Sequence, residues 1–143
     1  ERTMPFEYIP GALEFMKKLK KAGITVAIVT SSNDAKMEKV YKAHPELLEL
    51  ADAILTSEHF SKSKPDPECF LNAMERLGGR PETTVVFEDS LHGLAAGRAS
   101  GAYVIGLTTS FPREVIEPLC DMVIEDFCYM VTEDFTSLSQ RDS

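Results

Sequence analysis

The chain has 143 residues and a mass of 15.9 kDa, with 43% apolar and 27% charged residues, a balance that excludes a disordered or fibrous protein. Its net charge of -8 opposes binding to nucleic acid or to anionic membranes. No apolar run approaches the roughly 20 residues that cross a bilayer, and residues 1–5 lack a secretory apolar region. We therefore expect a cytoplasmic protein with no membrane or nucleic-acid partner.

Helical and strand patterns alternate in the first half of the chain. Apolar residues at helical spacing precede Gly23, and a β-branched apolar run follows it. Leu47, Leu48 and Leu50 indicate a short helical turn after His44-Pro45. The expected elements are a helix ending before Gly23, a strand at 24–29, a helix at 34–44, a helical turn at 47–50 and a strand at 53–56.

The second half repeats this alternation. Pro65-Asp66-Pro67 starts a helix that Gly78-Gly79 ends, and small residues between Gly93 and Gly101 suit a helix lying close to a sheet. Strands are expected at 84–87, 103–107 and 122–124, with a short helix at 114–119. The pattern predicts an α/β fold with a parallel sheet and right-handed crossovers. We assign residues 1–133 to this core and 134–143 to a polar tail.

Polar residues follow three of the predicted elements. They are Thr30-Ser31-Ser32-Asn33 after the first strand, Lys64 before a helix, and Glu88-Asp89 after the third strand. Ligands bind at the carboxyl ends of parallel strands, where helix N-termini also point. Hydroxyls, an ammonium group and an acidic pair are the chemistry that holds a phosphoryl group with Mg²⁺. The sequence thus predicts a phosphate and magnesium site.

Each of these signals has a structural alternative. The residues from Thr30 to Asn33 also fit a helix-capping loop, and a lysine in a polar segment such as Lys64 is usually a solvated surface residue. Asp89 could cap the following helix while Glu88 stays solvated. The cysteines Cys69, Cys120 and Cys128 are odd in number and lack zinc-type spacing, so we expect reduced thiols with neither a disulfide nor zinc.

Three segments together resemble the haloacid dehalogenase superfamily, especially the branch of β-phosphoglucomutase and pseudouridine-5′-phosphatase-like enzymes. They are Val26 to Ser32, Lys64-Pro65-Asp66-Pro67-Glu68-Cys69-Phe70 and Val85-Val86-Phe87-Glu88-Asp89-Ser90, within a resemblance that runs from about Ile9 to Ile124. The resemblance implies a Rossmann-like, three-layer α/β core with helices on both faces of the sheet.

The resemblance also implies a role for each polar position. Thr30 and Lys64 are expected to be catalytic: Thr30, with the Ser31 backbone, bonds the phosphoryl group, and Lys64 neutralises it. Ser32 and Asn33 are expected to contact a second phosphate or a substrate hydroxyl. Glu88 and Asp89 are expected to hold Mg²⁺. The implied activity is that of a phosphatase acting on a small phosphorylated metabolite.

One family motif has no counterpart here. The family takes its nucleophile from an Asp-x-Asp-Gly motif on a central strand, followed by a cap domain, and this sequence contains no Asp-x-Asp. That strand would lie between those carrying Thr30 and Glu88. We therefore expect a partial core, inactive by itself, which a further segment of the same protein completes.

Three other functions stay open from the sequence. A sugar-phosphate mutase uses the same residues. A receiver-like binding module has similar groups, but its acidic pair comes first along the chain and its lysine comes late. A degenerate relative would bind a phosphorylated ligand or a protein without turnover.

Overall fold

Alternating apolar and polar blocks of the sequence form strands and helices in the expected order. A computed structural model describes residues 12–30 and 33–126. The helices are α1 (Ala12–Lys21), α2 (Asp34–Ala43), α3 (Leu47–Leu50), α4 (Glu68–Leu77), α5 (Leu91–Ala99) and α6 (Arg113–Ile116). The strands are β1 (Ala27–Val29), β2 (Ala53–Leu55), β3 (Val85–Glu88), β4 (Tyr103–Leu107) and β5 (Met122–Ile124). Single 3₁₀ turns occupy Ser57–His59, Pro81–Thr83 and Glu117–Leu119.

Each predicted helix and strand is present, and the differences lie in where some of them begin or end. β1 begins at Ala27 rather than residue 24, because the backbone N–H of Val26 donates to Asp52 Oδ2 at 2.7 Å instead of to a neighbouring strand. The helix predicted at 114–119 divides into α6 and a 3₁₀ turn that contains Pro118. The polar tail predicted at 134–143 lies outside the described residues.

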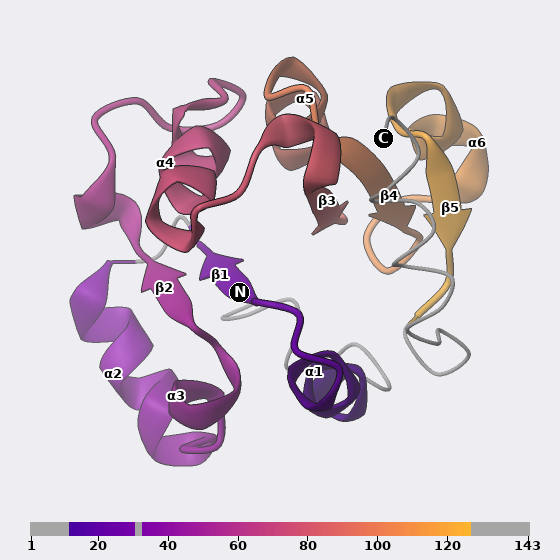
Figure 1. Cartoon of the computed structure of the whole chain (residues 1–143). Coiled ribbons are helices and arrows are strands. Elements are labelled where there is room, and N and C mark those ends of the chain that lie inside the picture. Colours follow the sequence, from indigo (N-terminus) through magenta and orange to yellow (C-terminus); the bar gives the residue numbers. More distant parts are fainter. Residues whose placement is uncertain (1–11, 31–32, 127–143) are drawn as a thin grey trace.

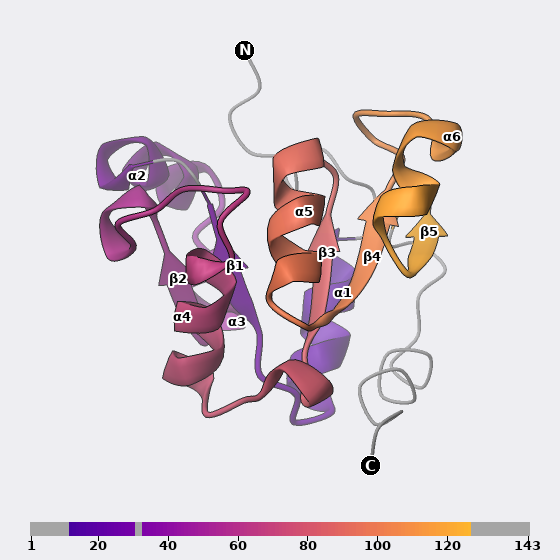
Figure 2. The same ribbon diagram turned by 90° about the horizontal axis from the view of Figure 1, so that it is seen from above.

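The five strands form two hydrogen-bonded sheets rather than one. β1 pairs in parallel with β2, and β4 pairs in parallel with both β3 and β5. Figures 1 and 2 show β1 and β3 as neighbours, yet they belong to separate sheets within the described part of the chain. The sheet is therefore interrupted between the strand that leads to Thr30 and the strand that ends at Glu88.

Helices cover both faces of the strands, as the three-layer prediction requires (Figure 1). On one face, Met16 of α1 packs with Met37 of α2 and Leu47 of α3. On the other face, α4 and α5 pack over Val86. Phe15 of α1 lies edge-on against Phe87 of β3, with ring centroids 5.6 Å apart. These apolar clusters bury both faces of the strands and supply the main stabilisation of the fold.

Two further expectations concern the state of the cysteines and the presence of membrane-spanning helices. Cys69 and Cys120 are free and buried, and burial raises the pKa of both thiols. Cys128 lies outside the described residues. Among residues 12–30 and 33–126, no helix has the length and apolar character needed to span a bilayer.

Candidate functional site

The first predicted segment follows β1. Thr30 is buried, with 8% of its surface exposed, and its backbone N–H donates to the carbonyl of Leu55 at 2.9 Å. Asn33 is the N-cap of α2, and its Oδ1 accepts from the Lys36 N–H at 2.9 Å. The side chain of Asn33 therefore caps the helix, as the structural alternative expected. Ser31 and Ser32 lie outside the described residues.

Side chains of the segments that follow β1 and β2 form hydrogen bonds with each other. Thr56, which follows β2 and is almost fully buried, donates from Oγ1 to Asp34 Oδ1 at 2.6 Å. A hydrogen bond with Glu58 lowers the pKa of Asp34, helped by the bond from Thr56. The same contact with Asp34 raises the pKa of Glu58. This link fixes the start of α2 relative to the end of β2, and so positions one end of the predicted phosphate-binding loop.

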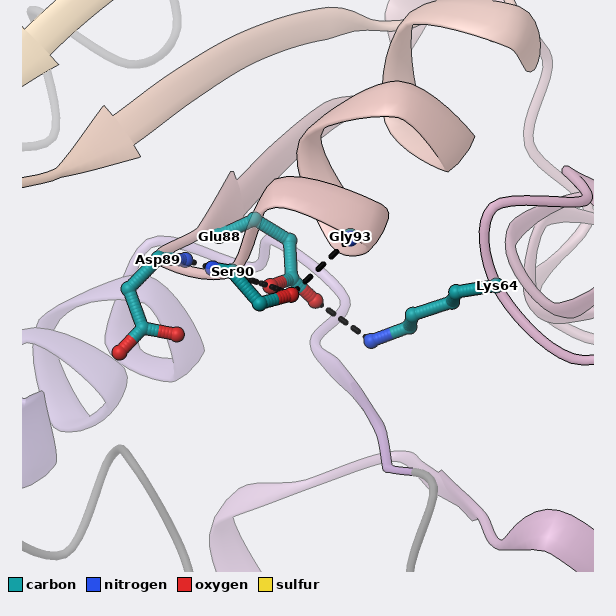
Figure 3. Close-up of polar contacts among 5 residues, drawn as sticks. All are labelled: Lys64, Glu88, Asp89, Ser90 and Gly93. Atoms are coloured by element: carbon teal, nitrogen blue, oxygen red, sulfur yellow. Dashed lines mark hydrogen bonds and ion pairs between the residues drawn. The ribbon is translucent and has the colours of Figure 1, made fainter. Parts of the chain in front are cut away.

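Lys64 and Glu88 form a largely buried ion pair. Lys64 Nζ donates to Glu88 Oε2 at 2.5 Å, with only 10% of the lysine side chain and 11% of the glutamate side chain exposed (Figure 3). The ammonium also lies 5.2 Å from the centroid of the Phe70 ring. The two residues are 24 positions apart in sequence, so tertiary structure creates this pair. The structural alternatives, in which Lys64 and Glu88 are solvated surface residues, are therefore wrong.

The loop that carries Lys64 is tied to α4 by Glu68. The Glu68 carboxylate accepts from the backbone N–H groups of Ser61, at 3.0 Å, and Lys62, at 2.9 Å. It also accepts from the Ser61 hydroxyl at 3.1 Å. The Ser61 backbone bond is the main reason that the pKa of Glu68 is lowered. Glu68 thus restrains the loop just before Lys64.

The second oxygen of Glu88 lies at the start of α5. Glu88 Oε1 accepts from the N–H of Asp89 at 3.2 Å, and from the N–H and hydroxyl of Ser90 at 3.4 and 3.2 Å. Ser90 is the N-cap of α5, and its Oγ accepts from the Gly93 N–H at 2.9 Å. The alternative in which Asp89 caps this helix is therefore wrong, because Ser90 does so.

Asp89 is held from a different part of the chain. Only 5% of its surface is exposed, and its Oδ2 accepts from Thr109 Oγ1 at 2.9 Å and from Ser110 Oγ at 2.8 Å. Sequence reasoning missed both hydroxyls. The signal was present, since Thr108-Thr109-Ser110 is a polar run directly after the strand β4. Ligands bind at the carboxyl ends of parallel strands, and this polar run meets that criterion as well as the predicted segments do.

The two adjacent acids point in different directions (Figure 3). Glu88 turns toward Lys64, whereas Asp89 turns away from that lysine. Both offer carboxylate oxygens, the donor type that Mg²⁺ prefers, and Mg²⁺ usually takes one or two protein carboxylates beside waters and substrate phosphate. No group of three or more His, Cys, Asp or Glu side chains suited to a metal ion occurs in residues 12–30 and 33–126. The two carboxylates of Glu88 and Asp89 are oxygen donors of the type that suits Mg²⁺.

Comparison with known proteins identifies the family. The sequence profile of haloacid dehalogenase-like hydrolases matches residues 4–101 of the chain. The chain belongs to the haloacid dehalogenase-like hydrolases. This membership agrees with the parallel α/β architecture described above, and favours a hydrolase over the receiver-like alternative.

Relatives in the family include both phosphatases and a phosphomutase. The chain is 37% identical over 106 residues to a bifunctional riboflavin kinase/FMN phosphatase from Arabidopsis thaliana, covering 74% of this chain and 28% of that protein. It is 34% identical over 99 residues to a β-phosphoglucomutase from Mycobacterium bovis, covering 68% and 38% of the two chains. A family IA haloacid dehalogenase hydrolase from Entamoeba histolytica superposes with a TM-score of 0.84 at 27% identity, covering 92% of this chain and 60% of that one.

The chain is shorter than each of these proteins. It spans 28% and 38% of the two relatives and 60% of the solved structure. The comparisons therefore establish the family and the fold of the matched segment.

Proposed function

We propose that the whole protein is a cytoplasmic, Mg²⁺-dependent phosphatase acting on a small phosphorylated metabolite. The observation that carries this proposal is the Lys64–Glu88 pair, which brings two of the three predicted segments into contact with little exposure to solvent. A buried cation beside a carboxylate at a strand end suits a site for a phosphoryl group and its counter-ion. The free thiols of Cys69 and Cys120 support a reducing compartment.

We assign each predicted site residue a separate role in binding. The hydroxyl of Thr30 and the loop from Ser31 to Asn33 would donate to phosphoryl oxygens near the N-terminus of α2. The ammonium of Lys64 would neutralise a phosphoryl oxygen while remaining beside Glu88. Glu88 and Asp89 would hold Mg²⁺, one directly and the other through water, because Mg²⁺ usually keeps several of its waters. Bound Mg²⁺ would supply positive charge that stabilises the transferring phosphoryl group.

The nucleophile would come from a strand placed between β1 and β3. Their facing edges belong to separate sheets in the described part of the chain. A parallel strand there would pair with both edges and bring its own carboxyl end to the Lys64–Glu88 pair. We propose that residues 1–133 form the matching part of the core, that 134–143 form a polar tail, and that the 143-residue chain alone has no turnover.

Metal-dependent hydrolysis by the full-length protein tests this function. A panel of sugar phosphates and other phosphorylated metabolites would be assayed for released phosphate with Mg²⁺ and with a chelator. We expect release only with Mg²⁺, loss of release in Asp89→Asn, and no change in the exposed control Glu82→Gln. Release that persists in Asp89→Asn or in the chelator would refute the proposed metal site.

A sugar-phosphate mutase is the second candidate, supported by the relative named β-phosphoglucomutase. A mutase would move the phosphoryl group between hydroxyls of one sugar instead of to water. The same assay, followed by analysis of the sugar-phosphate isomers, separates the two activities. Binding of phosphorylated compounds without either product would identify a degenerate, non-catalytic relative.

A further inference from the structure

The Glu88 carboxylate occupies space that a side chain at position 93 would fill. Gly93 is buried in the first turn of α5, and its N–H donates to the Ser90 hydroxyl that also bonds Glu88. A Cβ built on Gly93 would lie 2.6 Å from Glu88 Oε2 and still closer to Cδ and Oε1. Real Cβ atoms essentially never approach other atoms this closely, so the carboxylate holds its place only because residue 93 is glycine.

The steric conflict with a Cβ at position 93 involves the Glu88 carboxylate rather than the backbone. The three atoms nearest to a Cβ at Gly93 are the Cδ, Oε1 and Oε2 of Glu88, the far end of a side chain that can rotate away. Alanine is also a better helix former than glycine. A methyl group at position 93 should therefore move the carboxylate without unfolding α5.

We infer that Gly93 is a positioning residue, which acts by leaving room for the Glu88 carboxylate to lie between the Lys64 ammonium and the first turn of α5 (Figure 3). The contact with Lys64 follows from the geometry alone. The consequence for Mg²⁺ rests on the proposed function. Displacing the carboxylate removes the partner of a buried ammonium and moves one of the two proposed metal-binding side chains.

Gly97 provides a matched control on the same helix. It is also buried and lies one helical turn after Gly93. A Cβ at Gly97 would lie 3.1 Å from Val86 Cγ1 and 3.1 Å from Val104 Cγ2, in the apolar contact between α5 and the sheet. Gly97→Ala should therefore crowd the core, where neighbours cannot rotate away freely, and leave the Lys64–Glu88 pair intact.

The experiment compares Gly93→Ala, Gly97→Ala and the double variant Glu88→Ala/Gly93→Ala in the 143-residue chain. Three quantities would be measured: the urea midpoint of unfolding, the nuclear magnetic resonance signal of the Lys64 ammonium, and the dissociation constant for Mg²⁺ alone. For Gly93→Ala we expect a lower midpoint, because the buried Lys64 ammonium loses its partner, together with a lost or shifted Lys64 signal and Mg²⁺ binding weakened about tenfold or more. For Gly97→Ala we expect a lower midpoint with the other two quantities unchanged.

The three readings separate the inference from the proposed function. A Lys64 signal that is the same in Gly93→Ala and wild type would overturn the positioning role. Absence of Mg²⁺ binding in the wild-type chain would count against the metal proposal, while the Lys64 signal still decides the role of Gly93. Because Glu88→Ala/Gly93→Ala has no carboxylate beside Lys64, a Lys64 signal in Gly93→Ala that matches the signal in the double variant would demonstrate that the carboxylate has been displaced.

Discussion

At the scale of single residues, the site depends on charges removed from water. Lys64 and Glu88 are each about nine-tenths buried, so water and salt screen their interaction weakly. Removing one partner of such a pair leaves the other charge without compensation. The contact therefore matters to the stability of the chain as well as to its proposed chemistry.

We predict that Lys64→Met lowers the free energy of unfolding by about 3 kcal/mol, because Glu88 loses its cationic partner. The neighbouring Lys62 is exposed, so Lys62→Met should change stability by less than about 0.5 kcal/mol. Urea denaturation at neutral pH measures both. Equal stabilities of the two variants would contradict a buried ion pair.

The hydroxyls that hold Asp89 permit a second residue-scale test. Thr109→Val keeps the shape of the side chain but removes the donor to Asp89 Oδ2. We predict that it weakens Mg²⁺ binding about tenfold, as is usual when a group that orients a metal-binding carboxylate is lost. Thr109→Ser retains the hydroxyl and should bind Mg²⁺ as wild type does. Calorimetric titration with Mg²⁺ would show whether the hydroxyl, rather than the methyl group, is responsible.

At the scale of elements, a carboxylate at the start of α4 restrains the loop before Lys64. The folded state lowers the pKa of Glu68, so its stabilising contribution is fully present above the ordinary value of 4.5. That contribution is lost as the pH falls through the lower folded pKa, when the carboxyl binds a proton and accepts fewer hydrogen bonds.

We therefore predict that Glu68→Gln lowers the urea midpoint at pH 7 and that the difference from wild type shrinks below about pH 4.5. The matched control Glu75→Gln changes an exposed residue of the same helix and should have no such effect. A difference between wild type and Glu68→Gln that stays constant from pH 7 to pH 3 would show that the charge on Glu68 is irrelevant to the loop.

At the scale of the whole molecule, the interruption of the sheet leaves β1 and β3 with fewer paired edges than β4. β4 pairs on both sides and contains the fully buried Val104 and Ile105. β1 and β3 each pair on one side only within the described residues. Backbone amides at the interruption should consequently open to solvent more easily than those of β4.

Hydrogen exchange can test both this difference in amide protection and the proposed additional strand. In the 143-residue chain we predict the slowest amide exchange in β4 and faster exchange in β1 and β3. In the full-length protein, β1 and β3 should approach the protection of β4, because both strand edges would then be paired. Unchanged exchange in β1 and β3 of the longer protein would rule out a strand at this position.

Local sequence patterns were sufficient to predict the elements and their order. Apolar patterns predicted most helices and strands, and a run of small residues predicted α5. Glycines with left-handed backbones end α1 and α4 at Gly23 and Gly78, as expected. These features are local, because they depend on residues a few positions apart. The three-segment resemblance to the family was equally local, and the match over residues 4–101 confirmed it.

The contacts between the polar side chains of the site could not be predicted from the sequence, because they depend on packing between distant segments. Lys64 reaches Glu88 across 24 positions, and Thr109 reaches Asp89 across 20, through contacts that depend on how the strands are arranged. The collision at Gly93 likewise depends on the rotamer of Glu88, which no spacing in the sequence specifies. Chain periodicity fixes local conformation, whereas the partners of a buried polar group are set by packing between distant segments.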